Sequence, residues 1–439
     1  MRQLVFLPLL LAASTVTSQI VRTLGPFQEV FAWKQITFNI QGSMPLQDRF
    51  GELDVQEEST SEGVQKRHTS DIVFHNDNEG ERDWNTQNSR LRTTTTIRPS
   101  RNTGWNRPSS TSTTTPRPSS ALFTDESRQF FVQYNNLPMG VERVGRRVFI
   151  TLPRRRYGIP ATLNYLHLDQ DSNTRSPSLR PYPNFSASSY LTSVYRTRAD
   201  RCGRLWMVDT GMLEIPNNRQ QVQPPAIVVY DLNTDRPILR YNFKTSDIPS
   251  AITPTGLASI TVDIPDNDCN DAYAYVPDLA TYGLIVFSLK SNDSWRLSHN
   301  FFSFNPLVGN LNLAGQRFQW NDGIFSITLT NPTSAGCRDA FFHAMIGTDE
   351  FSVSTCTLRN RTASEDSNFW SLFSIIGNRG ANSQSTMHGY HAGSNVIFFA
   401  DIARSAVSCW NTGNPLSSST VGILASDTRR LGYPSGKCR

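Results

Sequence analysis

R-C-G-R-L-W-M-V-D-T, at Arg201–Thr210, is an apolar run with strand periodicity that ends at an acidic residue before a glycine turn. Similar runs recur at intervals of roughly 45–70 residues, as blades of a propeller would. They are D-A-Y-A-Y-V-P-D at Asp271–Asp278, W-N-D-G-I-F-S-I-T-L at Trp320–Leu329 and S-N-V-I-F-F-A-D at Ser394–Asp401. The pattern predicts an all-β propeller, whose ligand site lies on the axis where the inner strands of several blades converge.

Other segments support the all-β prediction. Leu257–Arg296 contains four alternating runs and predicts one complete four-stranded blade. No long stretch has helical periodicity, and 25 Pro and 26 Gly residues interrupt the chain. Further strands are expected at Phe31–Ile40, Arg147–Leu152, Ala161–Leu168, Ala226–Leu232 and Gly283–Leu289.

The first residues have the features of a secretory signal peptide. Arg2 precedes the apolar run Leu4–Ala13, and the small residues Val16 and Ser18 fit cleavage before Gln19. No later stretch approaches the ~20 apolar residues of a membrane-spanning helix. We therefore expect residues 1–18 to be removed and the mature protein to be secreted and extracellular.

Composition divides the mature chain. We assign residues 19–40 to an N-terminal strand of the propeller, residues 41–125 to a disordered insert and residues 126–439 to the propeller itself. The insert is polar, and Arg92–Ser120 is a Ser/Thr/Pro/Arg tract that has too few apolar residues to offset the entropy of folding. It is either an O-glycosylated mucin-like segment or an unmodified linker.

Cysteines and glycosylation motifs agree with secretion. The six cysteines are too widely spaced for a zinc site and allow three disulfides. Cys202 and Cys269 flank equivalent strands of neighbouring blades, so we expect them to pair, with Cys337–Cys409 and Cys356–Cys438 as the remaining bridges. N-glycosylation motifs occur at Asn184, Asn292 and Asn360.

Several functional classes lack their sequence signatures. The net charge of +5 is small for 439 residues, and no basic helix or aromatic-basic platform indicates nucleic-acid binding. The sequence contains no G-x-S-x-G, phosphate-binding glycine loop, C-x-x-C or nucleotide fingerprint. We therefore expect no cofactor.

A set of motifs, in order, resembles the insect Yellow/major royal jelly protein family. The resemblance covers Val21–Ile40 and Phe130–Pro434, and the insert between them departs from the family pattern. It implies a secreted six-bladed β-propeller. Family members act in cuticle or eggshell pigmentation and hardening, dopachrome conversion, biogenic-amine binding or nutrition. The motifs are W-K-Q-I-T-F (Trp33–Phe38), L-P-R-R-R-Y-G-I-P-A-T-L-N (Leu152–Asn164), C-G-R-L-W-M-V-D-T-G (Cys202–Gly211), L-A-S-I-T-V-D (Leu257–Asp263), A-Y-V-P-D (Ala274–Asp278), W-N-D-G-I-F (Trp320–Phe325) and S-C-W-N (Ser408–Asn411).

Acidic residues at the predicted strand ends have two interpretations. They either cap turns by accepting backbone N–H bonds or face the axis and pair with a protonated amine. A metal-dependent hydrolase site built from Asp209, Asp263, Asn321 and Asn395 lacks ligand spacing, and we expect no metal. The acidic residues are Asp209, Asp263, Asp278, Asp322 and Asp401.

His388 and His391, in H-G-Y-H, are either two loop histidines or the start of a functional site. A zinc site needs a third ligand. His388 is also a candidate general base for proton transfer on a catechol ring, because its ordinary pKa lies near neutrality.

Aromatic residues beside the presumed inner strands are either core packing or the walls of a pocket for a catechol or indole ring. They are Phe325, Phe398, Phe399 and Trp410. In amine-binding relatives a polar Thr/Asn pair and nearby Phe residues line the axial pocket. By resemblance, the ligand-binding set here is Ser385, Thr386, Asn395, Phe398 and Phe399, with Phe325 beside it.

The sequence therefore favours a secreted protein of cuticle or eggshell pigmentation and sclerotisation that binds a small aromatic amine or catechol at the propeller axis. A dopachrome-converting enzyme and a structural matrix protein without a small ligand are the alternatives. Whether the protein is an enzyme stays open at this point, because no catalytic residue is assigned.

Overall fold

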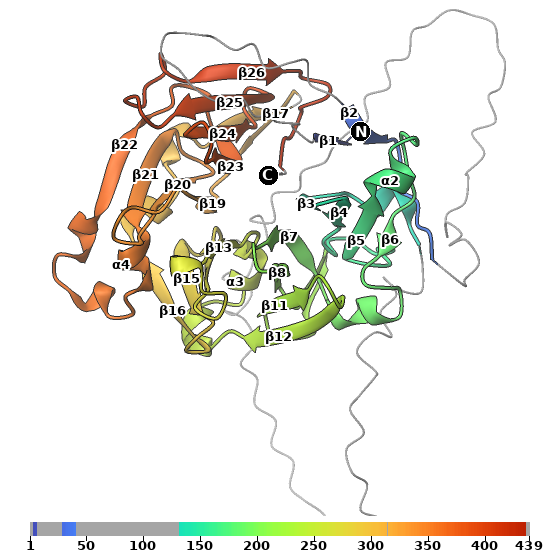
Figure 1. Cartoon of the computed structure of the whole chain (residues 1–439). Coiled ribbons are helices and arrows are strands. Elements are labelled where there is room, and N and C mark those ends of the chain that lie inside the picture. Colours follow the sequence, from blue (N-terminus) through green and yellow to red (C-terminus); the bar gives the residue numbers. More distant parts are fainter. Residues whose placement is uncertain (1–2, 7–28, 41–130, 314, 436–439) are drawn as a thin grey trace, which may run out of the picture. The chain divides into compact units, whose positions relative to one another are not determined.

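The computed structural model describes residues 3–6, 29–40, 131–313 and 315–435. The predicted insert and most of the predicted signal peptide lie outside these ranges. Within them, five four-stranded antiparallel sheets are arranged around a common centre (Figure 1). The all-β propeller prediction is confirmed. The expected number of blades was six, whereas the described residues form five four-stranded sheets.

Each sheet is a meander of strands in chain order, with its first strand nearest the centre. The first sheet contains β3 (Gly140–Val144), β4 (Arg147–Thr151), β5 (Leu163–His167) and β6 (Arg180–Pro181). The second contains β7 (Val194–Ala199), β8 (Arg204–Asp209), β11 (Ala226–Asp231) and β12 (Arg236–Asn242). The third contains β13 (Thr261–Asp263), β14 (Tyr273–Asp278), β15 (Gly283–Ser288) and β16 (Asp293–Ser298). The fourth contains β19 (Ile324–Leu329), β20 (Asp339–Ala344), β21 (Asp349–Ser354) and β22 (Phe373–Asn378). The fifth contains β23 (Ser385–His391), β24 (Val396–Asp401), β25 (Ala406–Asn411) and β26 (Gly422–Ser426).

Three two-stranded ribbons and several short helices connect or flank the sheets. The ribbons are β1 (Gln3–Phe6) with β2 (Glu29–Trp33), β9 (Met212–Ile215) with β10 (Asn218–Gln221), and β17 (Asn310–Leu313) with β18 (Gln316–Gln319). The α-helices are α2 (Leu168–Asp171), α3 (Thr253–Gly256) and α4 (Thr355–Arg359). The 3₁₀ turns are η2 (Gln133–Asn135), η3 (Ala187–Tyr190), η4 (Thr245–Asp247), η5 (Pro265–Asn267), η6 (Asn300–Phe302), η7 (Pro306–Val308), η8 (Ala363–Glu365) and η9 (Phe369–Leu372). No helix of the described residues is long and apolar enough to cross a membrane.

The predicted blade Leu257–Arg296 corresponds to the third sheet, so its four-strand pattern is confirmed. The predicted strand Phe31–Ile40 is shorter than expected, because β2 ends at Trp33 and only an isolated bridge joins Phe38 to Leu179. β2 pairs with β1 and does not join a four-stranded sheet. This segment therefore does not supply the strand of a sixth blade.

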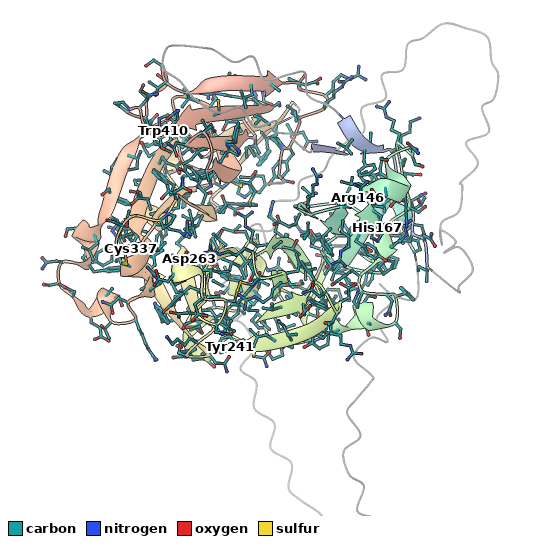
Figure 2. All side chains as sticks on the ribbon, viewed as in Figure 1. Arg146, His167, Tyr241, Asp263, Cys337 and Trp410 are labelled. Carbon is teal, nitrogen blue, oxygen red and sulfur yellow. A yellow bond between two sulfur atoms is a disulfide. The ribbon has the colours of Figure 1, made fainter. Side chains whose placement is uncertain are left out.

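Apolar side chains from both faces of neighbouring sheets form the core (Figure 2). Between the second and third sheets, Trp206 packs with its ring centroid 6.4 Å from that of Phe287, and both are fully buried. Burying such a side chain contributes roughly 1.5–3 kcal/mol. Trp410 of the fifth sheet is likewise buried and donates its Nε1 proton to the carbonyl of Asn414 at 3.0 Å, so it is a core residue.

One predicted disulfide is confirmed and the other pairings are wrong. Cys202 and Cys269 are bonded, with their Cα atoms 6.0 Å apart. Cys337 pairs with Cys356, because they flank the β20–β21 hairpin and its register brings their Cα atoms to 5.4 Å. Cys409, expected with Cys337, is a free thiol on β25 among the described residues. Cys438, expected with Cys356, lies outside the described residues.

The three predicted glycosylation sites are accessible. Asn184, Asn292 and Asn360 are all exposed. A glycan at any of them would extend into solvent without disturbing the core.

Candidate functional site

The first strands of all five sheets line a cavity on the propeller axis. It offers about 20 Å³, which is enough for a water molecule but far below the size of a bicyclic aromatic ligand. A ligand at this place therefore needs an opening at one mouth. The lining residues are Val141, Glu142, Arg196, Thr197, Arg198, Ser259, Ile260, Thr261, Ile327 and Met387.

The structure separates the polar residues of the predicted ligand site. Ser385 and Thr386 are fully buried at the start of β23, where Thr386 Oγ1 donates to the carbonyl of Pro434 at 2.7 Å. Asn395 lies beyond the far end of β23, in an exposed turn with φ 55°, and accepts a 2.6 Å bond from Tyr390. Five residues of strand separate Thr386 from His391, about 17 Å at 3.4 Å each. Asn395 therefore does not join the Ser385–Thr386 end.

The predicted aromatic wall is also divided. Phe398 and Phe399 belong to β24, the second strand of its sheet, so the axis is lined by β23 and not by Ser394–Asp401 as expected. Phe399 is buried and stacks on His388. Phe325, on the inner strand β19, does lie at the axis, but the guanidinium of Arg196 already covers its face at 4.5 Å from the ring centroid.

Four of the five strand-end carboxylates are structural. Asp209 accepts bonds from the backbone N–H groups of Thr192, Ser193 and Gly211, so the turn-capping interpretation is confirmed there. Asp209 and Asp263 bind different arginines, which excludes their sharing one cation; Figure 2 labels Asp263. The arginine partners are Arg240 for Asp209 at 3.1 Å, Arg338 for Asp263 at 3.0 Å, Arg296 for Asp278 at 2.8 Å and Arg404 for Asp401 at 3.4 Å.

Asp322 differs from the other strand-end carboxylates. It precedes β19, and among the described residues no arginine or lysine lies within 4.0 Å of its carboxylate. Burial is the dominant cause that raises the pKa of Asp322 to about 7, against smaller opposing effects of Trp320 and Arg155. A carboxyl whose pKa is raised in this way is a candidate general acid or base.

The surroundings of Asp322 are aromatic and apolar. Trp320 lies parallel to Tyr433 with ring centroids 6.4 Å apart, and both belong to the apolar cluster that contains Phe325 and Tyr195. The Tyr195 hydroxyl donates to Glu214 at 2.6 Å. This cluster draws residues from several inner strands and from the tail Leu431–Ser435, and we call it the axial mouth.

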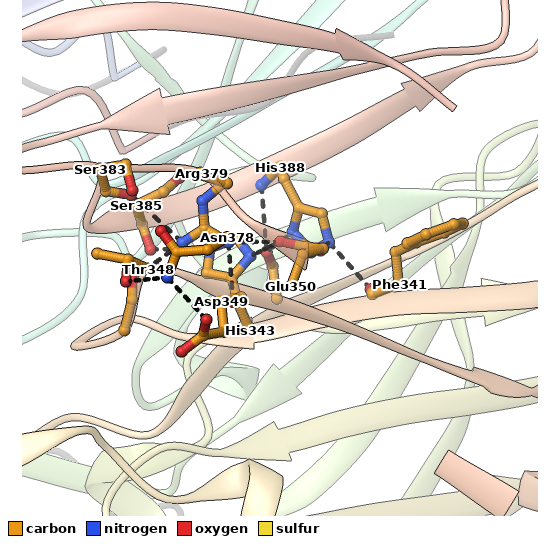
Figure 3. Close-up of polar contacts among 12 residues, drawn as sticks. Phe341, His343, Thr348, Asp349, Glu350, Asn378, Arg379, Ser383, Ser385 and His388 are labelled. Carbon is orange, nitrogen blue, oxygen red and sulfur yellow. Dashed lines mark hydrogen bonds and ion pairs between the residues drawn. The ribbon is translucent and has the colours of Figure 1, made fainter. Parts of the chain in front are cut away.

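A second cluster of titratable groups lies between the fourth and fifth sheets (Figure 3). His343 of β20 contacts Glu350 of β21 through Nδ1 and Oε2 at 2.8 Å, and Arg379 donates to the same oxygen at 2.6 Å. His343 Nε2 donates to the carbonyl of Ser385 at 3.1 Å, and His388 Nε2 donates to that of Phe341 at 2.9 Å. Each sheet thus provides a histidine that binds the backbone of the other.

The protonation of this cluster follows from its hydrogen bonds. A carbonyl only accepts, so the Nε2 atom of His343 carries a proton and its Nδ1 lone pair faces Glu350 when the ring is neutral. Burial lowers the pKa of His343 well below its ordinary value, with Arg379 as a further cause. Burial also raises the pKa of Glu350, against the opposing effects of His388 and Arg379.

His343, Glu350 and His388 are the group among the described residues with metal-ligating atoms within 4.8 Å of one another. Two imidazoles and a carboxylate are donors that zinc accepts. Both Nε2 protons, however, are already donated to carbonyls, and the charge of Arg379 lies beside the carboxylate. The cluster forms a hydrogen-bonded connection between the two sheets, in which Glu350 Oε1 lies 3.5 Å from His388 Nε2 and accepts no hydrogen bond from the described residues. His391 bonds to Ser394 at 2.8 Å in the adjacent turn and contributes no third ligand.

Arg196 and the tail were missed by sequence reasoning. The run V-Y-R-T-R-A at Val194–Ala199 places two arginines on one face of a strand that is otherwise buried, which is a signal for a charged axis. Arg196 contacts Ser435, which lies 239 residues away in the sequence, and no local sequence pattern predicts this contact.

Residues 192–436 match the family described as Major royal jelly protein. The L-dopachrome tautomerase yellow-f of Drosophila melanogaster is 48% identical over 313 residues, which cover 70% of this chain and 72% of that protein. Protein yellow of Drosophila melanogaster is 40% identical over 315 residues, which cover 70% of this chain and 56% of that protein. Among solved structures, a chain of a nidogen/laminin complex aligns with a TM-score of 0.37 and 9% identity, covering 67% and 85% of the two chains, a likeness too low to carry an argument.

Proposed function

This chain belongs to the major royal jelly protein family, and we propose that it is a secreted dopachrome tautomerase of insect pigmentation and sclerotisation. Its 48% identity to an L-dopachrome tautomerase supports the reaction. Disulfides and exposed glycosylation motifs support an extracellular site such as cuticle or eggshell.

The observation that carries the proposal is Asp322 at the axial mouth. Conversion of dopachrome to its dihydroxyindole isomer moves two protons from ring carbons to the two quinone oxygens, so atoms and electrons balance without an oxidant. In each transfer one carbon-bound proton is removed and one proton is added to oxygen. The ionised carboxylate of Asp322 takes the carbon-bound proton, and its protonated form returns a proton to oxygen. A pKa near 7 suits both steps, because neither form is strongly disfavoured at neutral pH.

The aromatic side chains of the mouth suit the substrate. Trp320 and Tyr433 present flat faces to a bicyclic ring. Burial of the carboxyl beside this cluster is the physical cause of the raised pKa of Asp322.

The test is the decay of dopachrome absorbance with purified protein and with Asp322→Asn. We expect wild-type activity to rise with pH through about 7, as the base ionises, and the variant to lose roughly 10²–10⁴-fold. Asp339→Asn is the matched control, since Asp339 is exposed at the start of β20 and should leave the rate unchanged. Equal rates for wild type and Asp322→Asn would refute the assignment.

Binding of a small aromatic amine without turnover is the second candidate. The same carboxylate favours it, because an ionised Asp322 attracts an ammonium group beside an indole face. Calorimetry with dopamine and serotonin decides between the two. Amine binding that is lost in Asp322→Asn, with no dopachrome turnover, supports the binder, whereas a protein inert in both assays is a matrix component.

A further inference from the structure

The structure holds an arginine on the propeller axis, Arg196, that has no carboxylate partner among the residues it describes. Arg196 of β7 is only 5% exposed and lines the axial cavity. Among the described residues, no carboxylate oxygen lies within 4.0 Å of its guanidinium, although the arginines of four strand-end pairs each have one. An isolated buried charge is costly, so its presence needs a reason.

The donors of Arg196 are occupied by backbone carbonyls. Nη1 donates to Ala258 at 3.1 Å, and Nε and Nη2 both donate to the one carbonyl oxygen of Ser435, at 3.0 and 2.8 Å. The Nε–Nη2 edge is the fork that binds the two oxygens of a carboxylate. Here a single neutral oxygen fills it.

Arg154 is a buried arginine that also donates to backbone carbonyls but lies outside the axial cavity, so it serves as a comparison for Arg196. It is fully buried and donates to carbonyls of nearby loops, among them Ile159 at 3.1 Å and Pro160 at 3.0 Å. These two partners are five and six residues away, and the guanidinium also donates to the carbonyls of Leu191 and Thr192, 37 and 38 residues away. Arg154 does not line the axial cavity. Arg196 instead faces the cavity and is covered by a tail residue 239 positions away.

Several contacts of the tail over Arg196 are hydrogen bonds between neutral groups. The carbonyl of Pro434 accepts from Thr386 at 2.7 Å, and the hydroxyl of Ser435 donates to the carbonyl of Met139 at 3.4 Å. Tyr433 lies parallel to Trp320. A carboxylate competes with the Ser435 carbonyl because its two charged oxygens match the Nε–Nη2 fork of Arg196, whereas the carbonyl offers one neutral oxygen.

We propose that Arg196 is a carboxylate-binding residue of the axial mouth, that the Ser435 carbonyl occupies its place in the resting protein, and that a carboxylated ligand displaces the tail. The inference rests on the proposed function for its substrate class: dopachrome, which keeps its carboxylate, rather than its decarboxylated analogue or a monoamine. Arg196 repels an ammonium group and already occupies the face of Phe325. Its role is therefore selection and positioning, while Asp322 handles the proton.

The test uses two inert bicyclic probes, indoline-2-carboxylate and indoline, measured by calorimetry on the full chain. Wild type should bind indoline-2-carboxylate about tenfold to a hundredfold more tightly than indoline. Arg196→Met should bind both equally. Arg196→Lys, which keeps the charge and loses the fork, should retain part of the preference and serves if the methionine variant does not fold. Arg146→Met, at an exposed ion pair outside the axial cavity, should keep the full preference.

Hydrogen exchange gives the second measurement. Amides of Leu431–Ser435 should exchange faster when indoline-2-carboxylate is bound and remain unchanged with indoline. Equal affinities for the two probes, no binding of either at millimolar concentration, or an unaltered preference in folded Arg196→Met would overturn the proposal.

Failure of the two proposals can be told apart. A protein that binds indoline-2-carboxylate through Arg196 yet leaves dopachrome unchanged refutes the tautomerase function and supports the carboxylate site. A protein that converts dopachrome and its decarboxylated analogue with equal kcat/KM, unaffected by Arg196→Lys, supports the function and refutes the carboxylate site.

Discussion

Asp322→Asn should remove a pH dependence of stability that this carboxyl imposes on the protein. The pKa of Asp322 is raised to about 7 in the folded state by burial, against 3.8 for an ordinary aspartate. Between these values the folded protein holds a proton that the unfolded chain releases. The free energy of unfolding therefore falls as the pH rises through this window, and the favourable contribution is complete only below the unfolded value.

The size of the effect follows from the two pKa values. Between pH 4.5 and 7.5 the carboxyl should lower the free energy of unfolding by about 3 kcal/mol. Guanidinium unfolding of wild type and Asp322→Asn at both pH values measures it, because the difference between the two proteins cancels the other titrating groups. Asp339→Asn should follow wild type, since Asp339 is exposed. Parallel pH dependences for wild type and Asp322→Asn would show that the carboxyl is not buried as described.

Three further predictions concern the scaffold. Arg379→Met should lower the free energy of unfolding by about 3–5 kcal/mol, because it leaves Glu350 buried without its cation. Arg146→Met, at an exposed ion pair, should change the free energy of unfolding by about 1 kcal/mol or less. Equal urea midpoints for the two variants would contradict this prediction. Peptide mapping should recover Cys337 joined to Cys356. Replacing both cysteines of the Cys202–Cys269 bridge, which closes 67 residues, by Ala should lower the free energy of unfolding by about 4 kcal/mol, against about 3 kcal/mol for the 19-residue Cys337–Cys356 bridge. A larger loss for the shorter bridge would argue against loop entropy as the cause. Deleting residues 41–125, whose composition predicts no folded core, should shift Tm by only a few degrees, because closing a longer loop adds little entropic cost; a chain that no longer folds would disprove it.

The strands were predictable because their signals are local. Apolar alternation and turn residues in Leu257–Arg296 predict the four strands of the third sheet. Cys202 and Cys269 flank strands that the repeat shows to be equivalent, which predicts their disulfide. Cys337–Cys356 was missed because the hairpin register that joins them depends on where β20 begins, which the sequence does not define to one residue. Asn395 was misplaced although G-S-N before an apolar run is a turn signal.

The candidate site was harder to predict because it is assembled from distant positions. Asp322 was recognised among five equivalent acidic residues, but only the absence of an arginine partner among the described residues separates it from the other four. Arg196 and Ser435 meet across nearly the whole propeller sequence. A hydrogen bond between such distant residues produces no periodic pattern in the sequence, so a single sequence does not predict it.

The order in which a ribosome makes this chain gives the tail a particular place in its biogenesis. Each four-stranded sheet is contiguous in sequence, and the last strand ends at Ser426, before Leu431–Ser435 is translated. All five sheets can form on the nascent chain while Arg196 and Thr386 still lack their tail partners. A nonsense mutation after Ser426 would therefore leave the sequence of every sheet intact and remove the Ser435 carbonyl, so the five sheets would form around a guanidinium that the tail no longer covers.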